Sequence, residues 1–303
     1  MLEIKNLYKN FGDTKVLQNI NLRLKQGEIL SILGNSGSGK STLLRILARL
    51  ETPTSFDSLC CTPKTAIMFQ NYALFPHLNV AENILFALHH YPKTKRQGRL
   101  EELLDFFNIA AIAKKRIDEI SGGQAQRVAI ARAVATECEL LLLDEPFSNL
   151  DSNLKEILRK DLKEMIKTQG LSAIIVTHDI DDAYYLSDYI ALLKQGRIID
   201  YNTPMELYFS PKSKESQAFL PHLNVIDKTL DEKDPFFAWI KSKNHIFSAS
   251  EIEIGSEFEA EVLEKHFLGA FTKLKLRYKQ ISFHMLINPY HPIDSKIGFK
   301  IAQ

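Results

Sequence analysis

The hydrophobic residues of the first 210 positions alternate between short continuous runs and stretches with helical spacing. The continuous runs, typical of buried parallel strands, occur at 28–33, 65–69, 140–143 and 173–177. Apolar residues at helical spacing occur at 43–50, 79–90, 99–108 and 153–168. Strands that alternate with amphipathic helices predict an α/β domain with a mostly parallel sheet. Shorter strand signals at 1–30, with turns at 12–13 and 26–27, precede this pattern.

The periodicity changes near residues 211–216, where a polar stretch predicts a linker. Beyond it, apolar residues alternate with period two at 258–262, 274–278, 281–287 and 297–301. This pattern predicts a small all-β module, which we interpret as a barrel. We therefore expect an α/β domain over 1–210 (with a helical subdomain at about 76–137), a linker and the start of a tail over 211–255, and the β module over 256–303.

The composition describes an ordinary globular protein. Of the 303 residues, 45% are hydrophobic and 25% are charged. A chain of this length and hydrophobic content can form two domains, each with its own core. With a formal net charge of +1, the chain lacks the excess of basic residues that is typical of nucleic-acid-binding proteins. We therefore expect no nucleic-acid partner. The three cysteines have neither disulfide nor zinc spacing, which favours a reducing compartment. No apolar run approaches the ~18 residues of a membrane span. We therefore expect a cytosolic protein, whose role at a membrane would require a membrane-embedded partner.

The strongest chemical signal is the segment 34–42, Gly-Asn-Ser-Gly-Ser-Gly-Lys-Ser-Thr, between an apolar run and a helical one. It fits the pattern G-x-x-x-x-G-K-[ST] in its strand–loop–helix setting. Glycines let backbone N–H groups approach a phosphate, and the helix start adds its positive end. We expect Lys40 to reach the β- and γ-phosphates and the Ser41 hydroxyl to bind Mg²⁺. The alternative is a Gly/Ser-rich turn that matches by chance.

A second helix start lies at Ser121, which forms a capping-box pattern with Gln124 before an alanine-rich run. Gly122 and Gly123 occupy the first turn, where each glycine lowers helix stability by roughly 1 kcal/mol. Exposed N–H groups at such a helix start suit an anion. We interpret the segment as a second phosphate-facing helix end, with an ordinary capped helix as the alternative.

Polar side chains follow two of the buried strands directly. Asp144 and Glu145 follow the strand at 140–143, and His178 follows the strand at 173–177. Ligand groups in open α/β sheets gather at the carboxyl ends of strands. We therefore expect Asp144 to hold Mg²⁺, Glu145 to orient or deprotonate a water, and His178 to sense the γ-phosphate. The alternatives are solvated carboxylates and a structural histidine.

Aromatic residues stand out at two places in predicted loops. Residues 71–78, Asn-Tyr-Ala-Leu-Phe-Pro-His-Leu, follow Gln70 and are unusually aromatic for a loop, so they are either buried or held for a partner. Phe11 lies just before the first turn. It is either a core aromatic or a platform for a nucleotide base.

Residues 1 to about 210 resemble the ATP-binding subunit of an ABC transporter. The similar motifs are Walker A at 34–42, the Q-loop at Gln70, the signature sequence at 121–124, Walker B at 140–145, the D-loop at 148–151 and the switch histidine at His178. The loop at 71–78 and the β-rich tail resemble the import subgroup that serves maltose, ferric iron, sulfate, molybdate or polyamines. The C-terminal modules of that subgroup are called TOBE domains.

The resemblance implies an α/β P-loop NTPase fold, with a RecA-like core sheet, a helical subdomain and an antiparallel β-subdomain. It implies a homodimeric ATPase at the cytoplasmic face of the inner membrane, working with two integral membrane permease subunits and, indirectly, a solute-binding protein. Its implied catalytic residues are Gln70, Glu145 and His178, with Glu145 as the base. Its implied Mg²⁺ ligands are Ser41, Gln70 and Asp144. Its implied ATP contacts are Phe11, Gly34, Asn35, Ser36, Gly37, Ser38, Gly39, Lys40, Ser41, Thr42, Ser121, Gly122, Gly123 and Gln124, the last four reaching ATP on the other subunit.

Three departures from the family pattern stand out. Ile120 replaces the usual leucine before the signature, and Asn149 replaces the commoner alanine of the D-loop. The span from 40 to 70 is short, with Phe56 where a glycine normally opens a hairpin, so we expect a trimmed antiparallel β-subdomain.

The sequence is compatible with several functional interpretations. A non-transport ABC protein would carry two cassettes or a long coiled-coil insertion, and a P-loop kinase would leave 121–124 and His178 without a role. Among importers, residues 2–11 and 193–198 look most like ferric-iron systems, while the short 40–70 span also resembles molybdate systems. Sulfate, polyamine and sugar import are further alternatives, and the tail could regulate the ATPase by binding a small ligand.

Overall fold

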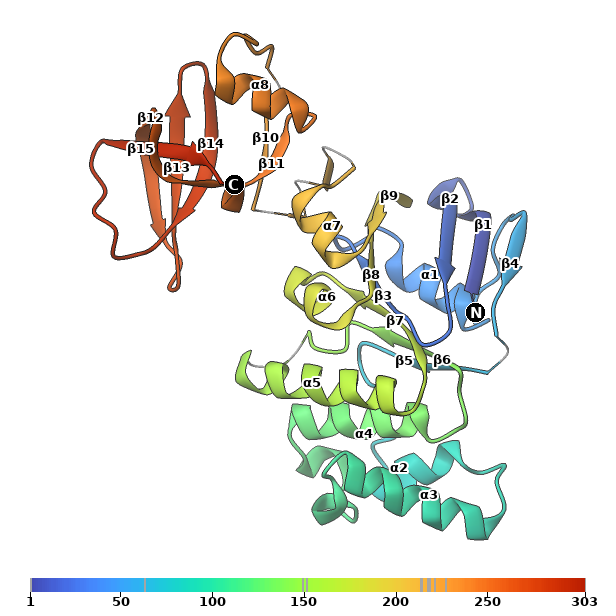
Figure 1. Ribbon diagram of the computed structural model, residues 1–303. Helices are drawn as coiled ribbons and strands as arrows, with labels where there is room; N and C mark the ends of the chain where they lie inside the picture. Colours follow the sequence, from blue (N-terminus) through green and yellow to red (C-terminus); the bar gives the residue numbers. More distant parts are fainter. Residues whose placement is uncertain are drawn as a thin grey trace. The chain divides into compact units, whose positions relative to one another are not determined.

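The computed structural model consists of two compact units, Met1–Tyr201 and Asn202–Gln303 (Figure 1). It describes residues 2–62, 64–148, 150, 152–212, 215–216, 219–220, 222–226 and 228–302. The first unit contains two clusters of buried apolar residues, and the second unit contains one of its own.

A six-stranded sheet with the order β5-β6-β7-β3-β8-β9 forms the centre of the first unit. Its strands are β3 (Ile29–Leu33), β5 (Thr65–Met68), β6 (Leu140–Asp144), β7 (Ser172–Thr177), β8 (Tyr189–Lys194) and β9 (Arg197–Asn202). The five strands from β5 to β8 pair in parallel. Every residue of β3, β6 and β7 is buried, which explains their continuous apolar runs. The predicted parallel sheet is thus confirmed, and the carboxyl ends of its strands share one edge.

A smaller antiparallel sheet with the order β2-β1-β4 packs beside the central one. It contains β1 (Leu2–Phe11), β2 (Thr14–Leu24) and β4 (Ser58–Cys60). Its apolar face shares a core with α1 (Lys40–Leu47) and with the central sheet. β4 has only three residues, in keeping with the short chain span between α1 and β5.

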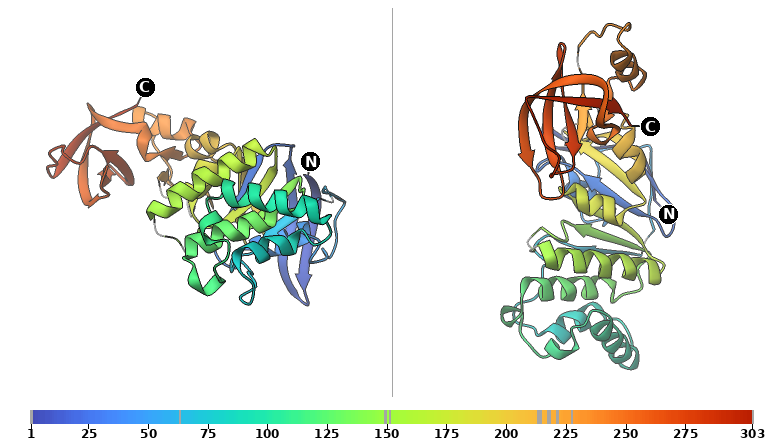
Figure 2. Two further views of the ribbon diagram at one scale, coloured as in Figure 1. Left: turned by 90° about the horizontal axis from the view of Figure 1, so that it is seen from below. Right: turned by 60° about the vertical axis from the view of Figure 1, so that its left-hand side comes forward.

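The remaining helices of this unit cover the other face of the central sheet or extend beyond it. They are α2 (Val80–Ala87), α3 (Lys93–Phe106), α4 (Gly122–Val134), α5 (Ser152–Thr168) and α6 (Ile180–Leu186), with 3-10 turns at Ala110–Ile112 and Ile117–Glu119. α2, α3 and α4 gather at one end of the unit, with α5 alongside α4 (Figures 1 and 2). α3 begins six residues before the predicted start at 99, because its first residues are polar and carry no apolar periodicity.

The second unit is a four-stranded antiparallel sheet with a helix packed on it. Its elements are α7 (Pro204–Phe209), β10 (Leu223–Val225), α8 (Pro235–Ser242), β11 (Ile246–Ser248), a 3-10 turn (Ala249–Glu251), β12 (Ile252–Phe267), β13 (Thr272–Tyr278), β14 (Ile281–Ile287) and β15 (Lys296–Ile301). The sheet order β14-β13-β12-β15 leaves β14 and β15 as edges. Strand pairing within residues 228–302 therefore forms an open sheet rather than the barrel that the period-two pattern suggested.

The stretch 211–255 differs from the expected linker. It contains α8, whose Phe236 is fully buried and lies 5.0 Å, ring centroid to ring centroid, from Phe299 of β15. Asp234 caps this helix by accepting from the N–H groups of Phe236 and Phe237. The described residues of 211–255 thus lie within the second unit, and from Ile226 onward several of them contribute to its core, well before residue 256.

Candidate functional site

The loop between β3 and α1 has a backbone that only glycine allows at two of its positions. Gly39 has φ +104, and a Cβ there would lie 2.7 Å from Leu17 Cδ2 and 2.9 Å from the Val16 carbonyl oxygen. A Cβ at Gly34 would lie 2.4 Å from the Leu193 carbonyl oxygen. The loop is therefore fixed by close backbone packing, and it leads directly into the first turn of α1, where N–H groups suit an anion.

Lys40 is buried at the base of this loop. Its Nζ donates to the carbonyl oxygens of Gly34 (2.8 Å) and Asn35 (3.0 Å). Burial lowers the pKa of the Lys40 ammonium, while the nearby Glu145 and Asp144 carboxylates oppose that shift. The cation is thus held inside the loop, where a phosphate bound by the loop would gain most from its charge.

Ser41 and Asp144 meet at the edge of the sheet. Ser41 Oγ donates to Asp144 Oδ1 over 3.1 Å. Burial raises the pKa of the Asp144 carboxyl, and the hydrogen bond from Ser41 opposes the rise. A hydroxyl and a carboxylate beside a phosphate loop are oxygen ligands of the kind that Mg²⁺ prefers, with water and phosphate completing its shell. In the described residues no group of three or more His, Cys, Asp or Glu forms a protein-only metal cage.

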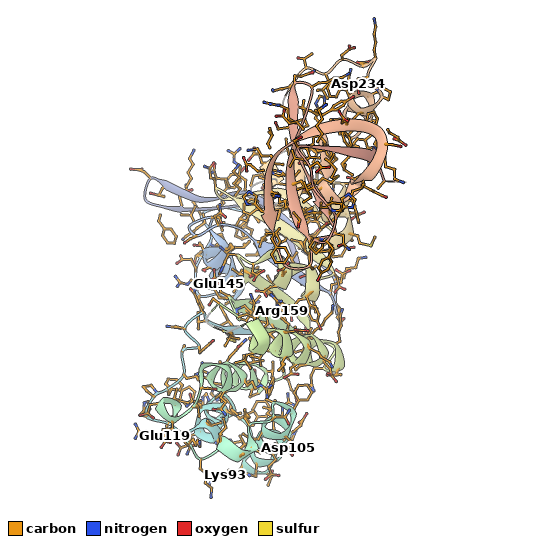
Figure 3. All side chains as sticks on the ribbon, turned by 90° about the vertical axis from the view of Figure 1, so that its left-hand side faces the viewer. Lys93, Asp105, Glu119, Glu145, Arg159 and Asp234 are labelled. Carbon is orange, nitrogen blue, oxygen red and sulfur yellow. The ribbon has the colours of Figure 1, made fainter. Side chains whose placement is uncertain are left out.

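Glu145 joins Gln70 and His178, which follow β5 and β7. Gln70 Nε2 donates to Glu145 Oε2 at 3.0 Å, and His178 Nδ1 lies 3.3 Å from the same oxygen. Glu145 has φ +47, a left-handed conformation that is uncommon for a side chain with a Cβ. Its N–H donates to the Val176 carbonyl at 2.9 Å, which holds this turn at the end of β6 (Figure 3 labels Glu145).

Most of these groups line one cavity of about 770 Å³, whereas Gly34, Ser38 and Asp144 are not among its lining residues. Its lining residues are Val16, Asn35, Ser36, Gly37, Gly39, Lys40, Ser41, Thr42, Gln70, Glu145 and His178. The structure thus brings together the predicted loop, glutamine, glutamate and histidine. Val16 could not be predicted as a lining residue, because an apolar residue on an amphipathic strand is expected to lie in the core.

Two predicted site segments lie outside this cavity in the single chain. Phe11 is 49% exposed at the β1–β2 turn, with Lys9 Nζ 4.5 Å from the centroid of its ring. Ser121 caps α4 by accepting from the Gln124 N–H at 3.3 Å, and neither residue is among those lining the cavity.

The two glycines of α4 differ in their surroundings. A Cβ at Gly123 would lie 2.3 Å from Leu154 Cδ2 of α5, so close packing of two helices explains that glycine. A Cβ at Gly122 would meet nothing within 4 Å. Packing against Leu154 is therefore a sufficient reason for glycine at 123, and of the two only Gly122 lacks a packing reason. In the D-loop segment, Asn149 and Asp151 lie outside the described residues.

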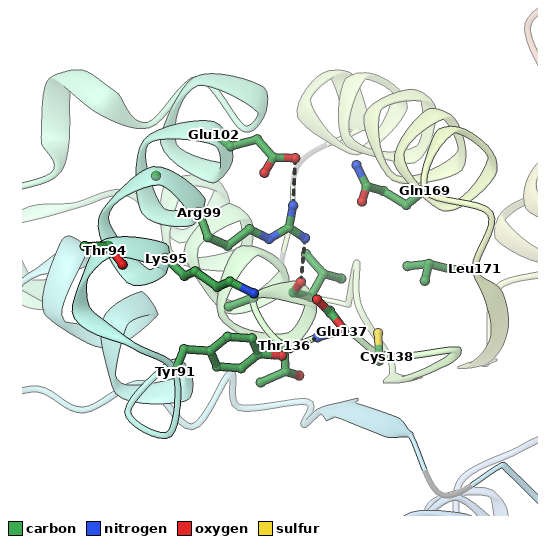
Figure 4. Close-up of a pocket in the computed structure, with 13 residues that line it drawn as sticks. Tyr91, Thr94, Lys95, Arg99, Glu102, Thr136, Glu137, Cys138, Gln169 and Leu171 are labelled. Carbon is green, nitrogen blue, oxygen red and sulfur yellow. Dashed lines mark hydrogen bonds and ion pairs between the residues drawn. The ribbon is translucent and has the colours of Figure 1, made fainter.

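A second cavity of about 530 Å³ lies between the start of α3, the segment after α4 and the end of α5 (Figure 4). Arg99 crosses it, donating to Glu102 at 2.7 Å and to the Val134 carbonyl at 2.9 Å. Its charged lining residues are Lys95, Arg99, Glu102 and Glu137, two cations and two anions. This balanced lining favours neither an anionic nor a cationic ligand, and we assign the cavity no role.

Comparison with known proteins agrees with this geometry. A family model described as ABC transporter matches residues 17–148. The Fe(3+) ions import ATP-binding protein of Vibrio cholerae is 38% identical over 240 residues, which cover 75% of this chain and 68% of the relative. The spermidine/putrescine import ATP-binding protein of Oleidesulfovibrio alaskensis is 34% identical over 298 residues, covering 94% and 77%. A solved dimeric ATP-binding cassette in a post-hydrolysis state, bound to ADP and Pi, matches with a TM-score of 0.60 and 33% identity, covering 67% of this chain and 99% of that one.

The phosphate loop on a parallel sheet and these similarities define a class: the chain belongs to the ABC transporter family. Within that family it is an ATP-binding subunit of the import type, and the predicted transport-coupled ATPase is confirmed. Of the helices in the described ranges, none is long and apolar enough to cross a bilayer.

Proposed function

We propose that this chain hydrolyses ATP with Glu145 as the base that activates the attacking water. The observation that carries the proposal is the contact of Glu145 with both Gln70 (3.0 Å) and His178 (3.3 Å) at the cavity containing the phosphate loop. The Gln70 amide and the His178 ring fix the carboxylate and leave an oxygen to accept a proton from water. Lys40 and the N–H groups of 34–41 hold the phosphates and stabilise the charge that develops on them.

Ser41 and Asp144 would hold Mg²⁺ in this site, with the Gln70 side chain as a further oxygen ligand. When bound, the ion would supply positive charge that offsets the negative charge of the phosphates. The residues fit this role because the hydroxyl of Ser41 and the carboxylate of Asp144 already lie 3.1 Å apart at the loop. Phe11 is proposed to stack on the adenine, since its ring is exposed at the end of β1.

Each complete site is proposed to combine two chains. Residues 34–42 of one chain would face Ser121–Gln124 of the other, with ATP between them. Support comes from the position of Ser121–Gln124 outside the cavity of their own chain, and from the dimeric state named for the solved relative. The free first turn of α4 at Gly122 suits the γ-phosphate.

The homodimer is proposed to act at the cytoplasmic face of the inner membrane with two permease subunits, a solute-binding protein delivering the substrate on the other side. Ferric iron is the proposed substrate, supported by the V. cholerae relative. Polyamine import is the second candidate, since the relative of that name matches 94% of the chain, tail included. Molybdate, sulfate and sugars are less supported. The C-terminal unit, with its antiparallel sheet, is proposed to be TOBE-like.

Two measurements test this proposal. Phosphate release by the purified full chain should require both ATP and Mg²⁺, and K40A should abolish it because the loop loses its cation. Cells lacking the gene should lose uptake of radiolabelled ferric iron while spermidine uptake stays normal. Loss of spermidine uptake alone would assign the second substrate and reject the first. Phosphate release that survives chelation of Mg²⁺ would contradict the metal assignment.

A further inference from the structure

The loop after Gln70 begins with a strained turn. Tyr72 has φ +61 and Ala73 has φ +46, so two consecutive residues with a Cβ adopt the left-handed conformation. This conformation crowds the Cβ against the backbone, and neither tyrosine nor alanine favours it. Other contacts must therefore hold the turn in place.

Backbone hydrogen bonds hold the N–H side of the turn, from Tyr72 to the Phe69 carbonyl (2.8 Å) and from Ala73 to the Asn71 carbonyl (2.7 Å). Arg132 of α4 holds the carbonyl side. Its two terminal nitrogens donate separately to the carbonyl oxygens of Tyr72 (Nη2, 2.7 Å) and Ala73 (Nη1, 2.7 Å). Its guanidinium carbon also lies 5.5 Å from the ring centroid of Phe75 in the same loop. Burial lowers the pKa of Arg132. Its planar guanidinium group can donate to two neighbouring carbonyls at once, which the single ammonium group of a lysine cannot do with the same geometry.

The far end of the loop is held separately, by Asn83 of α2. Its side chain accepts from the Phe75 N–H at 2.9 Å and donates to the carbonyls of Phe75 (3.1 Å) and Asn79 (3.0 Å). Arg116 adds a longer hydrogen bond, from Nη2 to the Pro76 carbonyl at 3.5 Å, so the loop has three side-chain anchors. Only the anchor at Arg132 lies next to Gln70, two residues before Tyr72.

We propose that Arg132 is a positioning residue for Gln70, acting through the turn at Tyr72 and Ala73. Gln70 in turn donates to Glu145 at 3.0 Å, so a continuous series of contacts runs from α4 to the proposed base. α4 is also the helix that begins at Ser121. A shift of this helix when Ser121–Gln124 meet a phosphate would therefore move Gln70 in the same chain. The inference rests on the proposed roles of Gln70 and Glu145.

A double-mutant cycle on ATP hydrolysis tests whether Arg132 acts through Gln70. R132K keeps the charge but can reach only one carbonyl well, and misplacement of Gln70 should lower kcat about tenfold. The KM for ATP should stay unchanged, because Arg132 is not among the residues lining the cavity. In a Q70A background, R132K should cause less than about a twofold further loss, because its route to Glu145 is already gone. Equal losses in both backgrounds would overturn the proposal.

Arg127 provides a matched control on the same helix. It donates to the Phe107 carbonyl at 3.0 Å and to Asp161 at 2.9 Å, and neither partner belongs to the loop at 71–78. R127K should therefore leave kcat near that of the wild type, even if it lowers thermal stability as much as R132K does. Equal loss of kcat in R127K would show that α4 is merely destabilised.

A rescue variant tests the strained turn directly. A73G in the R132K background should restore part of kcat, since glycine adopts φ near +46 without strain. No rescue, together with additive losses in the cycle, would reduce Arg132 to a structural role. These results are separable from the proposed function: no hydrolysis by the wild type rejects the function, whereas normal hydrolysis by both wild type and R132K rejects only this inference.

Discussion

Gln70 and Glu145 are joined by a 3.0 Å hydrogen bond although 75 positions separate them in the chain. The bond exists because β5 and β6 are parallel neighbours, so the residues that follow them emerge at one edge of the sheet. His178 reaches the same carboxylate from β7, the next strand over. This clustering of polar groups at adjacent strand ends is the basis of the proposed chemistry.

Replacement of Glu145 by glutamine tests the assignment of the base. E145Q should bind ATP with near-normal affinity, while hydrolysis falls by roughly a hundredfold or more because the amide cannot accept the proton from water. Unhydrolysed ATP should then trap the dimer, which light scattering would detect. D161N, at a partly buried residue of α5 bonded to Arg127 of α4, serves as a control for lost charge. Near-normal turnover by E145Q would refute the assignment.

The aromatic loop at 71–78 is predicted to receive a helix of the membrane partner. Tyr72 is half-buried and packs against the core, whereas the loop as a whole is held outside the sheet by Arg132 and Asn83. Replacing Tyr72 and Phe75 by serine should abolish transport, because the apolar contact with the partner is lost, while the isolated subunit still hydrolyses ATP.

The outcome is measured by uptake in cells and by recovery of the variant with membranes. Transport that persists with full membrane association would show that the two aromatic rings serve only the fold. Loss of ATP hydrolysis in the isolated double variant would point instead to disturbance of Gln70.

The neighbouring glycines of α4 predict opposite effects. G123A forces a Cβ against Leu154, 2.3 Å away, and should lower the free energy of unfolding by about 1–3 kcal/mol. G122A meets open space and gains helix propensity, so it should raise stability by up to roughly 1 kcal/mol. If Gly122 faces a phosphate, the same change should weaken ATP-dependent dimerisation.

Thermal or denaturant unfolding of the two variants, without nucleotide, gives the stability comparison. Light scattering with ATP and E145Q as the parent gives the dimerisation comparison. Equal destabilisation by both changes would contradict the packing described for Gly123. Undisturbed ATP-dependent dimerisation of G122A would remove the reason to place a phosphate there.

Many strands and helices of the first unit could be predicted from the sequence, because short stretches of neighbouring residues determine them. The runs that form β3, β6 and β7 are mostly apolar and buried throughout, as expected of strands covered on both faces. The phosphate loop was predictable because its backbone requires glycine at fixed spacings, as at Gly39 with φ +104.

Other features of the fold could not be predicted, because they depend on contacts between residues that are far apart in the sequence. Neither Tyr72 nor Ala73 favours a positive φ, and the side chain that holds Tyr72 comes from Arg132, 60 positions away. α8 was missed although Asp234 and Pro235 form a typical helix start, because the helix is only eight residues long. The period-two pattern of the tail predicted strands correctly, but it does not encode whether the edges of a sheet close into a barrel.

The central claim is that each ATPase site is shared between two chains, and a mixed dimer tests it most directly. One chain carries K40A in the phosphate loop, and the other carries S121R in the first turn of α4. In each parent dimer both sites are damaged. In the mixed dimer, a shared arrangement gives one site with both lesions and one wholly native site.

The measurement is ATP hydrolysis and ATP-dependent dimerisation of the 1:1 mixture, with a different tag on each chain to verify that mixed dimers are present. Shared sites predict that mixing restores both activities above the level of either parent. Sites built within one chain predict that every site stays damaged. Strict coupling between sites could silence hydrolysis alone, but the native shared site would still close the dimer on ATP. Failure of both readouts in verified mixed dimers would contradict the shared site.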